Sequence, residues 1–238
     1  MKIKLQGQEV DLLIGMDAEF FLLNNKGSYV AAARVIPGLK HQPHVLKNGV
    51  CHPDGLSLEV GAPPADTPEG MITNLFTVLQ EVKDLYLDPA GVTIAGAMEV
   101  RVNQVEGAQP EDLRFGCGTE FDANSSSMVK QVHQTNNDRR YSGFHIHLGF
   151  TSGQESNFFT YKDMSRLVKV LDRYVRQAGL GTTDRRATQY GGYGAFRVKP
   201  YGIEYRCMDC TVITNQRKLE SLLRMLNDLP RIFAEAHE

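Results

Sequence analysis

Asp11-Leu-Leu-Ile-Gly-Met-Asp-Ala-Glu-Phe-Phe-Leu-Leu23 is the stretch from which the fold of this chain can be worked out. A β-strand sends successive side chains to opposite faces. Met16, Ala18, Phe20 and Leu22 would therefore share one apolar face, whereas Asp17 and Glu19 would share the other. The pattern predicts a strand over residues 11–23 that has its core on one side and carboxylates on the other.

Three further stretches repeat this alternation. The predicted strands are residues 56–60, 141–150 and 202–208. In them the apolar side chains oppose Ser57, Glu59, His145, His147, Gly149, Glu204 and Arg206. If the four strands lie in one sheet, one face is core and the other gathers carboxylates, imidazoles and a guanidinium. A solvated outer face favours Lys, Thr, Ser and Gln instead, so the agreement between four strands favours a functional site.

Helical periodicity marks three other segments. A helix is expected to start at Asp66 or Thr67 and to bury Met71, Ile72, Leu75, Phe76, Leu79 and Val82. Two more are expected over residues 161–177, with Gly179 as the stop, and 216–236, with a bend at Pro230. A hairpin is expected from residues 11–23 back to 29–34, one or two strands over 92–105, and a loop over 181–200. The order predicts one α+β domain over residues 1–238, with a mainly antiparallel sheet and helices on one face.

Composition excludes several classes of protein. The chain has 238 residues, of which 26 are basic and 28 acidic, and 42% are hydrophobic. A protein that coats nucleic acid usually needs a strongly basic face, and a membrane span needs about 18 consecutive apolar residues, which this chain lacks. The N-terminus lacks the apolar core of a signal peptide, so a cytoplasmic protein is expected. Cys51, Cys117, Cys207 and Cys210 are then expected to be reduced, and the Cys207/Cys210 pair to be buried thiols rather than a zinc or redox site.

The carboxylates on the charged face point to a divalent cation. Clustered carboxylates repel one another unless a cation lies between them, and Mg²⁺ prefers oxygen ligands. The pair His145 and His147 keeps a second possibility open, because two or three histidines commonly bind zinc.

A stretch rich in arginine and glycine, residues 184–206, precedes and includes the last strand. Arginine binds phosphate with two parallel hydrogen bonds, and glycine lets the backbone approach a ligand closely. The chain has no P-loop motif. The stretch is therefore either a phosphate clamp or a flexible basic surface loop.

Six motifs occur in an order that resembles a known family. They are Gly15-Met-Asp-Ala-Glu-Phe-Phe-Leu22, Pro37-Gly-Leu-Lys-His-Gln-Pro43, Asp54-Gly55 with Glu59, Phe115-Gly-Cys117 with Phe121-Asp-Ala123, Gly143-Phe-His-Ile-His-Leu-Gly149, and the Arg/Gly stretch ending in Glu204-Tyr-Arg206. The set resembles the phage-encoded carboxylate-amine ligases of the type 2 group, in the superfamily of glutamine synthetase and glutamate-cysteine ligase. The resemblance implies a curved, mainly antiparallel sheet like that of the glutamine synthetase catalytic domain, with a charged catalytic face.

The resemblance also implies roles for residues. Asp17, Glu19, Glu59, His145 and Glu204 would bind metal, Mg²⁺ or Mn²⁺. His147, Arg185 or Arg186, Arg197 and Arg206 would lie at the phosphates of ATP, the co-substrate, and Arg197, Glu204 and Arg206 would form the catalytic set. Lys40 and Asp54 match the family without a firm role.

The implied activity is ATP-dependent formation of an amide or isopeptide bond through an acyl phosphate. The partners would be a small-molecule or peptide carboxylate and an amine, in the host cytoplasm if the protein is phage-encoded. Nucleic acid is not expected, except as a modified base that serves as substrate. Loops 37–53 and 115–140 are expected to contact the substrates. Two alternatives remain open: a zinc hydrolase that uses His145, His147 and Glu204, and a non-catalytic binding or phage structural protein that keeps the fold.

Overall fold

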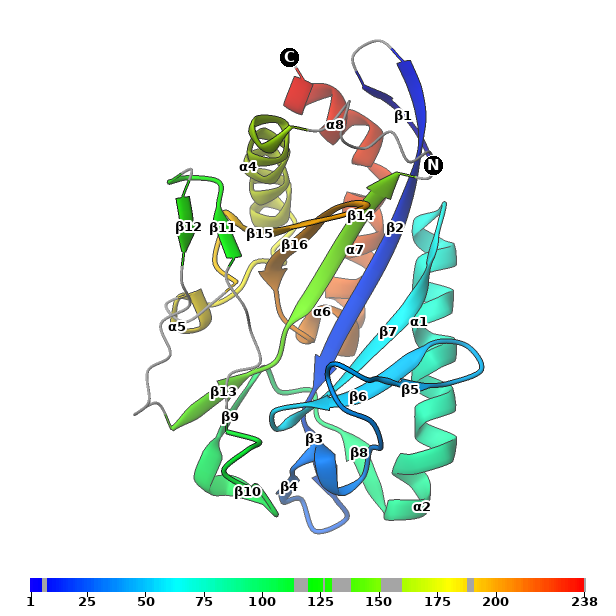
Figure 1. The fold of residues 1–238 in the computed structure, drawn as a ribbon, viewed down its shortest axis with the longest axis vertical. Coiled ribbons are helices and arrows are strands. Elements are labelled where there is room, and N and C mark those ends of the chain that lie inside the picture. Colours follow the sequence, from blue (N-terminus) through cyan, green and yellow to red (C-terminus); the bar gives the residue numbers. More distant parts are fainter. Residues whose placement is uncertain are drawn as a thin grey trace.

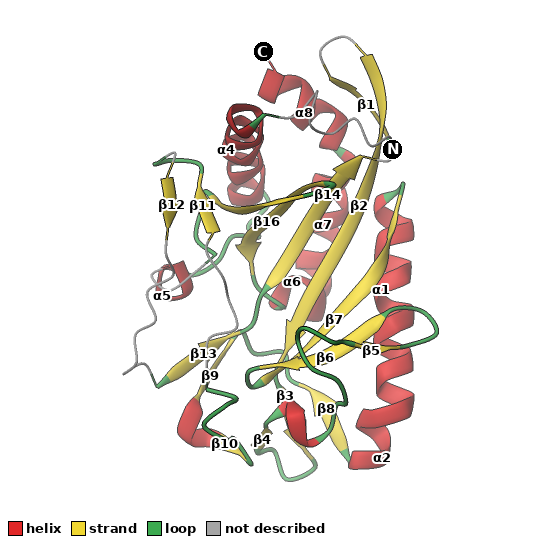
Figure 2. Cartoon of the chain, in the orientation of Figure 1, coloured by secondary structure: helices red, strands yellow, loops and turns green. Residues whose placement is uncertain are grey.

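The computed structural model describes residues 1–5, 8–113, 120–125, 127–129, 138–150, 160–187 and 191–237. Over these residues the protein is α+β, with one large, mainly antiparallel sheet and several helices (Figures 1 and 2). In the described residues nine strands follow one another across this sheet: β12 (Ser127–Val129), β11 (Glu120–Asp122), β15 (Ala195–Lys199), β16 (Gly202–Met208), β14 (Phe144–Phe150), β2 (Gln8–Phe20), β7 (Ser57–Ala65), β6 (Val50–Asp54) and β5 (His44–Val45). β1 (Lys2–Leu5) pairs with β2 as a further hairpin strand.

Two smaller sheets lie near the C-terminal end of β2, opposite the end that pairs with β1 (Figure 1). The first contains, in order, β10 (Val105–Glu106), β4 (Tyr29–Val30), β3 (Leu22–Asn24) and β8 (Val92–Ile94). The second pairs β13 (Arg139–Tyr141) with β9 (Glu99–Arg101). Phe21, Leu56 and Val100 belong to a small hydrophobic cluster beside these strands, separate from the main core.

The α-helices of the described residues are α1 (Pro68–Val82), α2 (Asp88–Ala90), α4 (Tyr161–Gln177), α5 (Asp184–Ala187), α6 (Thr211–Thr214), α7 (Gln216–Asn227) and α8 (Leu229–His237). Several of them cover one face of the large sheet. In the view of Figure 1, α1, α6 and α7 lie behind the sheet. α1 packs on β7 and β2, and α4 contacts β16. The main core lies between these helices and the apolar side chains of β2, β7, β14 and β16.

The four strands predicted to share a charged face are neighbours in this sheet, in the order β16, β14, β2, β7. β16 has the predicted bounds. α4 also has its predicted bounds, because Thr160 and Asp163 form a reciprocal capping box at its start and Gly179 ends it with φ of +68°. α1 begins as expected, where the Thr67 hydroxyl accepts the backbone N–H of Gly70 at 3.1 Å.

Several predicted strand boundaries were wrong. The predicted strand 11–23 is two strands, because the chain leaves the large sheet after Phe20 and enters a smaller one at Leu22. The predicted strand 141–150 is likewise divided between β13 and β14. β7 does not stop at Gly61 but runs through two prolines to Ala65. Proline fits there because β6 begins opposite Gly61, so in the described residues no strand pairs with the later part of β7 on that side.

The predicted hairpin return 29–34 is strand only at β4, since Ala32–Arg34 form a 3₁₀ turn. Residues 92–105 hold β8, β9 and a 3₁₀ turn before β10 begins.

The loop predicted over 181–200 was also wrong in part, since it contains α5 and β15. The predicted helix 216–236 is two helices, separated at Asp228, with Pro230 in the first turn of the second. Proline is tolerated in a first turn, where its missing N–H would have had no partner. Phe76 is 41% exposed rather than buried, and Val78 takes its place in the core.

The predicted burial of the Cys207/Cys210 pair is confirmed. Cys51, Cys207 and Cys210 are free and buried, whereas Cys117 lies outside the described residues. Burial raises the pKa of Cys207 to about 11 and that of Cys210 to about 12, so both thiols stay protonated at neutral pH. No helix in the described part of the chain is both long enough and apolar enough to cross a membrane.

Asp172 gives the fold a testable pH dependence. This carboxylate on α4 is 6% exposed and accepts the hydroxyl of Tyr205 on β16 at 2.7 Å. Burial raises its pKa from 3.8 to about 6, despite the opposing effect of the Tyr205 bond. Between those pH values the folded protein keeps a proton that the unfolded chain releases, so Asp172 lowers the free energy of unfolding as pH rises from about 4 to 6.

Asp172→Asn should remove this component, because the amide is uncharged and its oxygen can still accept the Tyr205 hydroxyl. The difference in melting temperature between variant and wild type should therefore shift in favour of the variant from pH 4 to pH 7. Thermal melts of both proteins across this range measure that difference directly. A constant difference would contradict a protonated Asp172 in the folded state.

Candidate functional site

The register of the large sheet brings the predicted site residues together. In antiparallel strands, directly opposed side chains lie on the same face. Glu19 on β2 is opposite Glu59 on β7, and Asp17 is opposite His145 on β14. On the other side, Glu204 on β16 lies between His147 and Arg197. Side chains from five adjacent strands thus converge on one face.

A cavity of about 150 Å³ opens at this face. Its lining contains four carboxylates and four cationic side chains, together with two imidazoles. These residues are Asp17, Glu19, Glu59, Glu204, Lys40, Arg197, Lys199, Arg206, His52 and His145. We call this the charged cavity.

Two carboxylates of the charged cavity, Glu19 and Glu59, form with Asp54 a group that could hold a cation. Ligand oxygens of Glu19, Asp54 and Glu59 lie within 4.8 Å of one another. Burial and the neighbouring charges of Glu59 and Asp54 raise the pKa of Glu19 to about 7. The buried Glu19 carboxylate is held in place by the backbone N–H of Gly143, at 2.7 Å. A hard divalent cation would relieve the repulsion in this all-oxygen cluster.

The side chain of His145 is an uncharged imidazole beside that cluster. Its ring is 3% exposed, and burial together with the charges of Arg206 and Arg186 holds its pKa well below the usual range. Its Nε2 is buried and makes no hydrogen bond within the described residues. Because the ring is neutral, its 3.7 Å approach to Glu204 through Nδ1 adds little as an ion pair. With the ring proton on Nδ1, toward Glu204, the lone pair of Nε2 would be available to a metal ion.

Glu204 lies in the same cavity, among cations. Its Oε2 contacts the Lys199 ammonium at 2.6 Å, and its Oε1 contacts Arg206 and, at 3.4 Å, Arg197. Burial alone would raise the pKa of Glu204, but the Arg206 and Arg197 guanidinium groups and Lys199 lower it to about 2. Glu204 is therefore ionised throughout the physiological range.

Arg206 is 1% exposed and bridges two glutamates. Its Nε donates to Glu120 at 3.0 Å and its terminal nitrogen to Glu204. Glu120 in turn accepts the backbone N–H of Gly191 at 3.0 Å. These hydrogen bonds hold the Arg206 guanidinium in a fixed position, where it lines the charged cavity.

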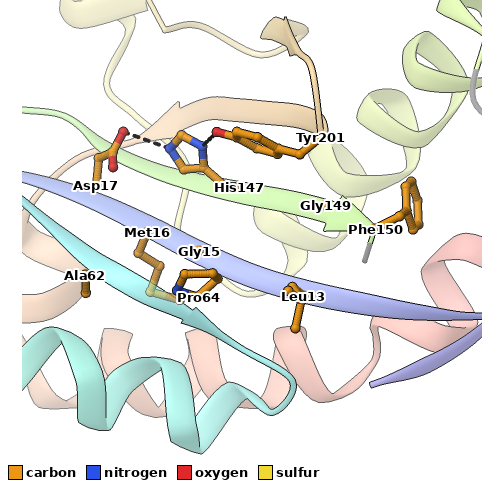
Figure 3. A pocket seen from close by; sticks show the side chains of 10 residues that line it. All are labelled: Leu13, Gly15, Met16, Asp17, Ala62, Pro64, His147, Gly149, Phe150 and Tyr201. Carbon is orange, nitrogen blue, oxygen red and sulfur yellow. Dashed lines mark hydrogen bonds and ion pairs between the residues drawn. The ribbon is translucent and has the colours of Figure 1, made fainter. Parts of the chain in front are cut away.

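A second, more apolar pocket of about 330 Å³ adjoins this site (Figure 3). Its lining is Leu13, Gly15, Met16, Asp17, Ala62, Pro64, His147, Gly149, Phe150 and Tyr201. Asp17 belongs to both cavities. His147 lies between Asp17 and Tyr201: its Nε2 is 2.8 Å from Asp17, and its Nδ1 is bonded to the Tyr201 hydroxyl.

Three predicted phosphate-binding residues do not line the charged cavity as the structure describes it. His147 lines the apolar pocket instead. Arg185 has an exposed side chain with a contact of 3.7 Å to Glu99. Arg186 is fully buried and donates to the backbone carbonyl of Gly191 at 2.9 Å and, more weakly, to that of Arg206. Arg186 therefore holds the backbone of the β15–β16 region. The motif Phe115-Gly116-Cys117 and most of the substrate loop 115–140 lie outside the described residues.

The pattern of strand alternation missed Asp54, His52, Lys40, Lys199, Glu120 and Tyr201. Lys40 is bonded to Asp54, and His52 on β6 lies 3.5 Å from Glu59. The motifs Pro37–Pro43 and Asp54-Gly55 were the sequence signals that pointed to Lys40 and Asp54. Glu120 contacts a residue 86 positions away, which no local pattern reveals.

Comparisons with known proteins add no assignment. No family model matches the chain, and no curated protein matches it.

Proposed function

We propose that this protein is a Mg²⁺-dependent, ATP-consuming carboxylate-amine ligase with the fold of the glutamine synthetase catalytic domain. One observation carries the proposal: adjacent strands place an all-carboxylate cluster, a neutral imidazole and fixed guanidinium groups around a single cavity. Glu19, Asp54, Glu59 and His145 are the residues that would hold a cation, and Asp17, opposite His145 on the same face, would be a further ligand, with Glu204 nearby. The resemblance described above points to the same face.

The charge balance of the cavity supports a nucleoside triphosphate. Four carboxylates and four cationic side chains line it, and Asp54 beside it adds a fifth carboxylate, so the positive and negative side chains nearly balance. Two bound Mg²⁺ would add about four positive charges, which the roughly four negative charges of a nucleoside triphosphate would offset. A neutral ligand would leave that charge unbalanced.

The two cavities together suit such a molecule. Because they share Asp17, a ligand with an anionic end and an apolar ring can extend from the charged cavity into the pocket of Figure 3. The phosphates would then lie near Arg197 and Lys199, and the nucleoside between Pro64 and Tyr201.

The reaction needs positioning and charge neutralisation rather than a protein nucleophile. The substrate carboxylate attacks the γ-phosphorus, the bond to the β–γ bridging oxygen breaks, and ADP leaves. An amine then attacks the acyl phosphate, releasing phosphate and one proton. Arg197 and Lys199 would offset charge on the transferring phosphoryl group. Arg206, oriented by its hydrogen bond to Glu120, would do the same. Bound Mg²⁺ would supply further charge neutralisation at the phosphate oxygens.

The geometry favours this activity over a zinc hydrolase. Both ring nitrogens of His147 already have partners, Asp17 and Tyr201. His145 and His147 therefore cannot both bind one zinc ion without breaking those bonds. The candidate cluster in the described residues contains only oxygen ligands, which suits Mg²⁺ or Mn²⁺ better than zinc.

Product analysis tests the proposal. With Mg²⁺ and the correct carboxylate, turnover should release ADP and phosphate rather than AMP and pyrophosphate. Hydroxylamine can replace the unknown amine and trap the acyl phosphate as a hydroxamate, so only carboxylates need to be screened. Glu59→Gln, purified in the same way, controls for contaminating ATPases. AMP as the stoichiometric product would overturn the acyl-phosphate mechanism.

A further inference from the structure

We infer that Tyr201 is a positioning residue, which fixes the ring of His147 and, through it, the carboxylate of Asp17. Figure 3 shows the three side chains in one line along the edge of the apolar pocket. The Tyr201 hydroxyl is bonded to Nδ1 of His147, and Nε2 of the same ring lies 2.8 Å from Asp17 Oδ2. The significance of this row for metal binding rests on the proposed function, whereas the geometry of the row does not.

The chemistry of the three groups sets the direction of both bonds. An ionised carboxylate only accepts hydrogen bonds. Nε2 of His147 must therefore carry the proton that is donated to Asp17. In the neutral ring Nδ1 then has a lone pair, which accepts the Tyr201 hydroxyl proton. Burial and the charges of Asp17 and Glu204 raise the pKa of Tyr201, so the phenol keeps that proton.

The backbone is built to keep Tyr201 in this place. The carbonyl of Tyr201 accepts the N–H of Phe150 at 3.1 Å. A side chain at Gly149 would put Cβ 3.0 Å from the Tyr201 ring and 3.2 Å from its carbonyl oxygen. At Gly202, with φ of +150°, a Cβ would lie 2.1 Å from the carbonyl oxygen of Leu148. Glycine at these two positions lets the turn between β15 and β16 pack closely against β14.

Burial alone does not explain the bond to His147. The Tyr201 residue is 39% exposed, yet its hydroxyl is bonded to the His147 ring. The contact instead matches the outer-shell partners of metal sites, in which a ligating carboxylate is itself held by a hydrogen bond and removing the partner costs about 10–100-fold in affinity or activity. His147, with both nitrogens engaged, would act on Asp17 rather than on the phosphates directly. This differs from the role that the family resemblance implies for it.

The test compares Tyr201→Phe with Tyr86→Phe, a matched control. Tyr86 also bonds a histidine, with its hydroxyl 2.7 Å from Nε2 of His44, but lies outside both cavities. Long-range ¹H–¹⁵N spectra of ¹⁵N-histidine protein, with His147→Gln for assignment, report the ring directly. In the wild type, His147 should be the Nε2–H tautomer, and Tyr201→Phe should shift its Nδ1 resonance while Tyr86→Phe leaves it unchanged.

Mn²⁺ binding without nucleotide, followed by electron paramagnetic resonance, is the second readout. Tyr201→Phe should weaken Mn²⁺ binding about tenfold, with little change in melting temperature. An unshifted His147 Nδ1 resonance, unchanged Mn²⁺ affinity, or an equal loss of affinity in Tyr86→Phe would each overturn the inference. Neither readout requires turnover, so a wild type that ligates no substrate would contradict the proposed function and still leave Tyr201 tested.

Discussion

Replacing Glu19 with glutamine should abolish ligation and the thermal response to Mg²⁺ and ATP, yet leave the metal-free protein as stable as the wild type or more so. Glu19 lies with Asp54 and Glu59 in the acidic cluster, and burial and these neighbours raise its pKa to about 7. The amide removes the unfavourable charge, and its oxygen can still accept the backbone N–H of Gly143, at 2.7 Å in the wild type. The site is thus built at a cost in stability.

The expected effects have defined sizes and a defined pH dependence. Binding to the folded state stabilises by about 2.7 kcal/mol at a hundredfold excess of ligand over Kd, so wild-type melting should rise clearly with Mg²⁺ plus ATP. Because the folded pKa of about 7 exceeds the unfolded value of 4.5, Glu19 lowers stability as pH rises between them. Without metal, the gain in stability of Glu19→Gln over the wild type should therefore be largest at pH 8 and vanish near pH 4.

Melting curves at both pH values, with and without Mg²⁺ and ATP, measure these effects. Glu220→Gln makes the same chemical change at an exposed site on α7 and should behave as wild type. If Glu19→Gln melted far below wild type without metal and still responded to Mg²⁺ and ATP, Glu19 would be a structural residue. The shared carboxylate cluster would then not be the metal site.

Arg206→Lys should lose most activity and, in addition, much of the stability of the fold. A lysine ammonium cannot reproduce the planar fork that contacts Glu120 and Glu204 together. One buried carboxylate would then lose its contact with the residue 206 cation, although Gly191 still donates to Glu120 and Lys199 still contacts Glu204, so the cost is at most about 3–5 kcal/mol of unfolding free energy. Loss of its contribution at the phosphates should cost roughly 2–4 kcal/mol of transition-state stabilisation.

Glu120→Gln separates the two effects. This change also weakens the buried pair behind Arg206, but it leaves the guanidinium in the cavity. Denaturant unfolding should show both variants destabilised, whereas turnover measured well below their melting temperatures should fall much further in Arg206→Lys. Turnover near the wild-type level in Arg206→Lys would show that Arg206 does not act on the phosphates.

Much of the architecture was predictable from the sequence because alternation is a local property. The bounds of β16 and α4 follow from side-chain periodicity and local capping. The two faces of β2, β7, β14 and β16 follow from the twofold repeat of a strand, which placed Glu19, Glu59, His145 and Glu204 on one side before their neighbours were known.

The partners of these residues were not predictable. A shift of β2 by two residues against β14 would keep every side chain on its face but would separate Asp17 from His145. The packing of the whole chain selects the register. The burial of Arg186 and the place of Arg197 on a strand, in a stretch that looked like loop, likewise depend on pairing with distant segments.

The sequence alone therefore determined which side chains share the charged face, since backbone geometry sets that within a few residues. Only the tertiary structure decided which of them meet. It brought Asp54 to Glu19 and Glu59, Glu120 to Arg206, and Tyr201 to His147. Except for Asp54 and Glu59, these contacts join residues 35 or more positions apart, and they form only when the sheet assembles and the core beneath it is buried.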